Sequence, residues 1–141
     1  MGKYISFMGT QFVAIALATV IFSGLSETTS AQNYGVSVMV GGEAEYDACS
    51  STGRVAGLNS NGDNFLAVRK GPAGSHQMID KLYTGATVYM CDTEGNWIGV
   101  VYSTNGNQDC GVSSPIARKQ AYSGSCRSGW VHQKYIAPLA G

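Results

Sequence analysis

The stretch FLAVRKGPAG, residues 65 to 74, decides the fold because it joins a short apolar run to two adjacent cations and a turn. Leu66 and Val68 alternate with their neighbours, which is typical of a strand with one buried face. Gly71 and Pro72 then predict a turn. A cradle of backbone amides for an anion would normally open a helix, and no helix is predicted to follow. The stretch is therefore predicted to be a strand that runs into a turn.

Short segments of the same kind fill the chain after residue 31. The sequence contains 19 glycines, which separate short runs of apolar and β-branched residues. No run of helical length in this part keeps an apolar period of three to four residues. An all-β fold follows, either a small barrel or a sandwich. The clearest predicted strands are residues 34–40, 54–58, 65–69, 77–82, 86–92, 96–103 and 129–133.

Two connections between these strands carry further predictions. The tetrapeptide TEGN, residues 93–96, predicts a hairpin that pairs its two flanking strands antiparallel. The segment from Ser103 to Arg127 is long, polar and contains two cysteines near its ends. We expect it to be a surface loop closed by a disulfide (a stapled loop) rather than part of the core. The last strand, around Trp130, must then return to complete the sheet.

The first 31 residues differ from the rest of the chain. Lys3 precedes an apolar run over residues 12–22, and a polar segment with the small residues Thr29 and Ala31 follows. This order is typical of a secretory signal peptide. The apolar run is shorter than the span of about 20 residues that a membrane requires. We therefore expect residues 1–31 to be removed and the mature chain to be periplasmic or extracellular, without stable membrane insertion.

The charge of the chain limits its partners. Nine basic residues balance nine acidic ones, so the formal net charge is zero. Such a balance gives no long-range attraction to nucleic acid or to an anionic membrane. We expect no nucleic-acid partner.

All four cysteines follow the expected cleavage site. An even number in an exported chain predicts two disulfides, for which three pairings are possible. We favour Cys110 with Cys126, which closes the insertion with a stabilisation of about 3 kcal/mol, and Cys49 with Cys91. The competing interpretation is a four-cysteine zinc site, which would usually contain a CxxC pair, and this sequence has none. We predict no metal and no cofactor.

Several short motifs occur in order along the chain. They are FLAVR at 65–69 with Gly71-Pro72, Gly85 with Val88, Trp97 with Val100, and Gly129-Trp130-Val131 with Tyr135-Ile136. This ordered set resembles the bacterial SH3 (SH3b) domain family, from about Arg54 to Leu139, apart from an insertion at about 104–126. Asn96 departs from the pattern, because the family more commonly has glycine before the tryptophan.

The resemblance implies a small SH3-like β-barrel of five to six short strands, here with a disulfide-stapled loop insertion. The domain would cover residues 54–141, after an N-terminal segment at 32–53 with a possible extra strand. Similar domains in exported bacterial proteins are commonly attached to cell-wall enzymes, and they are thought to bind peptidoglycan peptides or other envelope partners. The insertion lies where many relatives have a short hairpin, so the ligand site cannot be carried over directly.

Aromatic and cationic residues supply the candidate ligand site. Tyrosine offers a flat apolar face with a polar tip, and guanidinium groups suit carboxylates. Trp97 and Trp130 are expected in or near the core. For every candidate the alternative stays open, namely a half-buried barrel residue or a solvated surface charge. The candidates are Arg69, Lys70, Tyr83, Tyr89, Tyr102, Arg127 and Tyr135.

Catalysis has little support in the sequence. His76 or His132 could act as a general acid or base with Asp80 or Asp92, but the sequence does not set their geometry. Paired cysteines offer no thiolate, and no GxSxG motif is present. The alternation of polar residues over 59–63 predicts a turn rather than a calcium loop, because the downstream glutamate is missing.

We therefore expect a non-catalytic exported binding module that recognises a peptidoglycan peptide or glycan, or another cell-envelope component. A secreted factor or inhibitor that binds an envelope protein through its stapled loop is the alternative. A small hydrolase is the third possibility.

Overall fold

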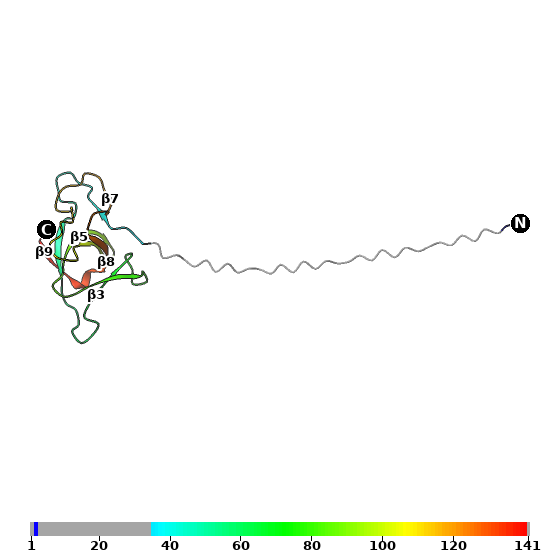
Figure 1. The fold of residues 1–141 in the computed structure, drawn as a ribbon, viewed down its shortest axis with the longest axis horizontal. Helices are drawn as coiled ribbons and strands as arrows, with labels where there is room; N and C mark the ends of the chain where they lie inside the picture. Colours follow the sequence, from blue (N-terminus) through cyan, green and yellow to red (C-terminus); the bar gives the residue numbers. More distant parts are fainter. Residues whose placement is uncertain (1, 3–34, 141) are drawn as a thin grey trace. The chain divides into compact units, whose positions relative to one another are not determined.

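The computed structural model describes residues 2 and 35–140, and Figure 1 shows their arrangement. Apart from Gly2, the predicted signal peptide lies outside the described residues. The described chain is all-β, as predicted, with a single turn of 3-10 helix. Its elements are β1 (Met39–Val40), β2 (Ser51–Val55), β3 (Leu66–Arg69), β4 (Met78–Leu82), β5 (Thr87–Glu94), β6 (Trp97–Tyr102), β7 (Gln120–Ala121), β8 (Arg127–His132), the helix η1 (Gln133–Tyr135) and β9 (Ile136–Ala140).

Seven of the strands form one antiparallel sheet in the order β4-β3-β8-β6-β5-β2-β9, and β1 pairs with β7 in a separate two-stranded sheet. Strands β4 and β9 are the two edges of the large sheet, so this sheet is not closed. The number of strands exceeds the five to six that the family resemblance implies. In the part of the chain that is described, no helix is long and apolar enough to cross a membrane.

The predicted hairpin is confirmed. Strands β5 and β6 pair antiparallel, and the pair Glu94 and Trp97 closes a two-residue turn. Gly95 in that turn has a φ of +56°, which glycine adopts without steric cost.

Several predicted strand limits were wrong. The strand expected at 34–40 is limited to Met39–Val40 within the described residues, and the strand expected at 54–58 lies instead at Ser51–Val55. The apolar residues of RVAGL (54–58) predicted a strand that continues to residue 58. Gly57 has a φ of +73°, however, which ends the extended backbone. Strand β9 was not among the predicted strands. It contains Pro138 and lies at an edge of the sheet, where proline is tolerated.

The large sheet buries a core on each face. Alternate residues of a strand point to opposite faces, so Val100 and Val131 belong to one core while their neighbours Val101 and Trp130 belong to the other. The first core consists of Val55, Leu66, Val68, Leu82, Val88, Ile98, Val100, Tyr102, Val131 and Ile136. The second core consists of Val38, Val40, Ala48, Cys49, Val101, Cys110, Val112 and Trp130.

The second core corrects the prediction for the insertion. Cys110 and Val112 are only 3% and 1% exposed, so the segment after Ser103 is not merely a surface excursion. The insertion lies against the N-terminal segment, where Cys49 N donates to Val112 O and Ala48 N donates to Ser114 O. These two segments run side by side at one end of the domain in Figure 1. Together they bury one face of the large sheet.

Both favoured disulfides are confirmed. Cys49 bonds to Cys91, and Cys110 bonds to Cys126. The first disulfide ties the N-terminal segment to β5, and the second closes the insertion onto the start of β8. Both therefore stabilise the second core, which contains Cys49 and Cys110 themselves.

Candidate functional site

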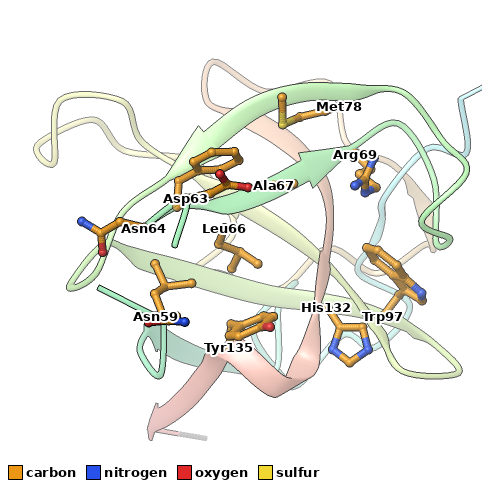
Figure 2. Close-up of a pocket in the computed structure, with 12 residues that line it drawn as sticks. Asn59, Asp63, Asn64, Leu66, Ala67, Arg69, Met78, Trp97, His132 and Tyr135 are labelled. Atoms are coloured by element: carbon orange, nitrogen blue, oxygen red, sulfur yellow. The ribbon is translucent and has the colours of Figure 1, made fainter. Parts of the chain in front are cut away.

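A pocket opens where two neighbouring strands separate. Strands β3 and β8 are joined by only one register pair, Arg69 with Trp130. Beyond this pair the strands diverge, and a pocket of about 400 Å³ lies between residues 58–69 and the end of β8. We call it the β3–β8 pocket (Figure 2).

One side of the β3–β8 pocket is an aromatic wall made of Trp97, His132 and Tyr135. Trp97 begins β6 and pairs with His132 at the end of β8, and Tyr135 follows in η1. The rings of Trp97 and His132 lie 5.5 Å apart edge to face, and those of His132 and Tyr135 lie 6.2 Å apart. Sheet pairing and one turn of helix thus place three rings in a row.

The imidazole of His132 has a defined hydrogen-bonding role. Its Nδ1 accepts from Lys134 N at 3.2 Å, which caps η1. A neutral imidazole carries its proton on one nitrogen only, so Nε2 is the donor of this ring. His132 therefore adds a hydrogen-bond donor to the aromatic wall.

The charged residues of the β3–β8 pocket have few partners of their own. Arg69 is half-buried, and its Nη1 donates to His76 O at 2.9 Å. In the described structure the sole ion pair joins Arg127 to Asp80, so Arg69 has no carboxylate partner there. Asp63 also lines the pocket, and it forms no hydrogen bond or ion pair with the described residues.

The polar turn predicted over 59–63 is formed and lies at the rim. Asn59 Oδ1 accepts from Asn61 N at 2.9 Å, and Asn59 O accepts from Gly62 N. Asn64 follows with a φ of +53°, and no other described residue except glycine has a positive φ. Asparagine tolerates this conformation better than most residues, and such backbone strain is found often at binding sites.

Two of the predicted ligand residues, Arg69 and Tyr135, meet in the β3–β8 pocket. Tyr102, which was expected to be open, is only 2% exposed and belongs to the first core. Its hydroxyl donates to Asp80 Oδ2 at 2.8 Å, and Arg127 Nη1 donates to the same oxygen at 2.9 Å. Tyr102 is therefore not open, because an acidic partner 22 residues away in the sequence holds its hydroxyl. Its place on the floor of a ligand groove stays a prediction, since it lines the depression beside Asp80.

The electrostatics of this Asp80 cluster follow from its contacts. Burial raises the pKa of the Asp80 carboxyl, but hydrogen bonds from Lys81 N, Tyr102 and Arg127 outweigh burial and hold that pKa below its usual value. Burial, and then the bond to Asp80, raise the pKa of the Tyr102 hydroxyl well above its ordinary value. The cluster is a carboxylate held ionised by donors.

The other three candidates lie elsewhere. Lys70 is exposed beside Val36, Tyr83 is 58% exposed at the rim of a depression next to the Asp80 cluster, and Tyr89 packs against the second core. Tyr102 and Arg127 line that same depression, so three of the candidates lie together there. The seven candidates therefore do not form one site.

The acid–base pairs considered from the sequence are not formed among the described residues. Asp80 is bonded as above, and Asp92 Oδ2 accepts from Met39 N at 3.0 Å. Neither carboxylate bonds to His76 or His132. His76 packs against Gly71, and its buried Nδ1 has no partner in this part of the chain.

Of the twelve lining residues only Arg69 and Tyr135 were predicted as ligand-site candidates, and the residues missed include Trp97, His132, Asp63 and Asn64. Trp97 was assigned to the core, and His132 was considered only as an acid or base. The pairing of Trp97 with His132 was the missing information, and it depends on β6 lying next to β8. Comparison with known protein families, with curated proteins and with solved structures found no match for this chain.

Proposed function

We propose that the chain is an exported, non-catalytic binding module that recognises a cell-wall peptide or glycan through the β3–β8 pocket. The observation that carries this proposal is the composition of the pocket. An aromatic wall faces a polar rim and a half-buried arginine that has no carboxylate partner among residues 35–140. Pockets with apolar walls and a few convergent polar groups are the usual form of small-ligand sites.

We also propose that the large sheet is an opened and extended relative of the SH3b barrel. The ordered motifs support this, because FLAVR, the Val88 segment, the Trp97 segment and GWV fall on β3, β5, β6 and β8. Their inward side chains share the first core. The extra strands and the second core then come from the N-terminal segment and the insertion.

Export is part of the proposal. The two disulfides are compatible with an oxidising compartment, where such bonds form and persist. The signal-like order of residues 1–31 supports the same location.

The second candidate function is a secreted protein-interaction factor. Tyr46 is 66% exposed in the stapled N-terminal segment, at a separate pocket of about 600 Å³ that also contains Glu43, Glu45 and Asp47. An exposed tyrosine among carboxylates suits a protein surface with basic residues.

Sedimentation with purified cell-wall sacculi tests the first function. We expect the exported chain to sediment with sacculi, Trp97→Ala to stay in the supernatant, and Tyr46→Ala to behave as the unaltered chain. Thermal unfolding of both variants separates lost binding from lost folding, because Trp97 also packs against the second core. An unaltered chain that stays in the supernatant at every salt concentration would remove wall binding. Partner capture that is sensitive to Tyr46→Ala would then favour the second function.

A further inference from the structure

We infer that the β3–β8 pocket binds a short peptide by its free carboxyl end, with the carboxylate at Arg69 and the preceding residues directed toward Asp63. This inference rests on the proposed function and names the chemical class and the orientation of its ligand. It is carried by the unequal distribution of donors and acceptors along the pocket.

The guanidinium of Arg69 has donors left for a ligand. One of its donors is used by His76 O, which anchors the side chain to the turn after β3. Its other N–H groups have no bonded partner among the described residues. Arg127 provides the contrast, because Asp80 already neutralises it at 2.9 Å. A half-buried guanidinium without an anion is compensated best by a ligand carboxylate, whose two oxygens match its fork of donors.

The second step places more donors at the same end. Arg69 pairs with Trp130, and His132 lies two residues further along β8. Residues two apart on a strand share a face, so the register directs His132 to the face that carries Arg69. Figure 2 shows Arg69 at the same end of the pocket as Trp97 and His132. Because Nδ1 of His132 accepts from Lys134 N, its Nε2–H adds a second donor for an anion.

The third step concerns the other end. Asp63 and Asn64 lie away from Arg69 in Figure 2. Asp63 is an acceptor without a partner in the described structure, and the Asn64 side chain is likewise unbonded there. Peptide N–H groups or an ammonium group of a ligand would donate hydrogen bonds to the oxygens of these side chains. One end of the pocket therefore suits an anion and the other suits donors, which is the polarity of a peptide chain that ends in a carboxylate.

The fourth step favours a peptide over a glycan. Rings in a row accept either sugar faces or peptide planes. A neutral sugar would leave the charge of Arg69 uncompensated on binding, and a desolvated charge without a partner opposes binding. A free carboxylate removes this cost, so the pocket favours the carboxyl end of a peptide over the neutral sugar rings of a glycan.

The direct test uses the unaltered chain and two probes from one source. Amidase digestion of purified sacculi releases free peptides and leaves glycan strands, whose lactyl groups keep a carboxylate from each cleaved amide bond. These glycan carboxylates are converted to carboxamides before titration, so that the strands report on the sugars alone. We expect the peptide pool to bind in calorimetric titration and the glycan strands not to bind. Conversion of the peptide carboxylates to carboxamides is expected to weaken binding about tenfold or more, the size of a lost charge-assisted hydrogen bond. Equal binding of the amidated pool, or binding of glycan alone, would overturn the inference.

Variants of Arg69 test the same ligand assignment from the side of the protein. Arg69→Gln should weaken binding of the free-acid peptides about tenfold and leave binding of the amidated peptides nearly unchanged, with Arg69→Lys in between. Arg54→Gln is the matched control, because Arg54 is an exposed cation on β2 outside the β3–β8 pocket. If sacculi do not bind at all, the proposed function fails. If sacculi bind through Trp97 but acid and amide peptides bind alike, only the ligand assignment fails.

Discussion

The indole N–H of Trp130 donates a hydrogen bond of 2.7 Å to the carbonyl oxygen of Val36, across 94 residues of sequence. Trp130 lies in β8 and is only 1% exposed, because the N-terminal segment covers the face of the sheet that carries its ring. Trp130 is also the residue of β8 that pairs with Arg69 of β3. Residues 36–50 are therefore packed as part of the domain.

The first prediction tests this bond. Trp130→Phe keeps an aromatic ring but removes the donor and leaves a cavity in the second core. We expect the free energy of unfolding to fall by about 2 to 3 kcal/mol, the sum of a lost hydrogen bond and incomplete packing. Urea unfolding measures the change. Trp97→Phe, at a half-buried ring, is the comparison, and an equal loss in both variants would contradict the role given to Val36.

The second prediction concerns the Asp80 cluster. Tyr102→Phe removes one donor to the carboxylate and should lower the free energy of unfolding at pH 7 by about 1 to 2 kcal/mol. The folded-state pKa of Asp80 lies below its ordinary value of 3.8, so its donors stabilise the fold above about that pH. This stabilisation is lost as the pH falls through the folded-state pKa. Unfolding curves between pH 7 and 2 should therefore show the two proteins converging on acidification, and a constant difference would exclude the mechanism.

The third prediction uses the close packing of β8 on β3. A Cβ at Gly129 would clash with the Val68 Cγ1 methyl and lie 3.1 Å from Arg69 O. Gly129→Ala should therefore cost about 1 to 3 kcal/mol of unfolding free energy, because neither a buried valine nor the backbone yields easily. Gly74→Ala is the matched control, since no atom lies within 4 Å of its Cβ and its φ is ordinary. Thermal melting distinguishes the two, and equal melting temperatures would contradict the packing described.

The strands that were predicted best are those whose signal is local. FLAVR alternates clearly, and the two strands of the TEGN hairpin are apolar runs on either side of a recognisable turn. Their partners are close in sequence. Strands β1 and β7 have two residues each and pair across about 80 residues, so no local pattern reveals them. The second core escaped prediction for the same reason, since Cys110 and Val112 are buried only because the N-terminal segment lies against them.

The candidate site was predicted only in part because it depends on strand order. Arg69 and Tyr135 were named from their chemistry, but the sequence does not say that β3 adjoins β8 and that β8 adjoins β6. That order brings Arg69, His132 and Trp97 to one pocket. It also brings Asp80 to Tyr102 and Arg127, which turns two predicted ligand residues into parts of a structural cluster.

The fourth prediction compares the two disulfides. Their cysteines are 42 residues apart for Cys49–Cys91 and 16 residues apart for Cys110–Cys126. A longer closed loop restricts the unfolded chain more, so paired Cys→Ser replacement should cost about 4 kcal/mol for the first and about 3 kcal/mol for the second. Guanidinium unfolding of the two double variants measures these losses. The reverse order would mean that native contacts of the insertion, and not chain entropy, set the stabilisation. Because the β3–β8 pocket contains no cysteine, the Cys110→Ser/Cys126→Ser chain should keep its affinity for wall peptides while folded.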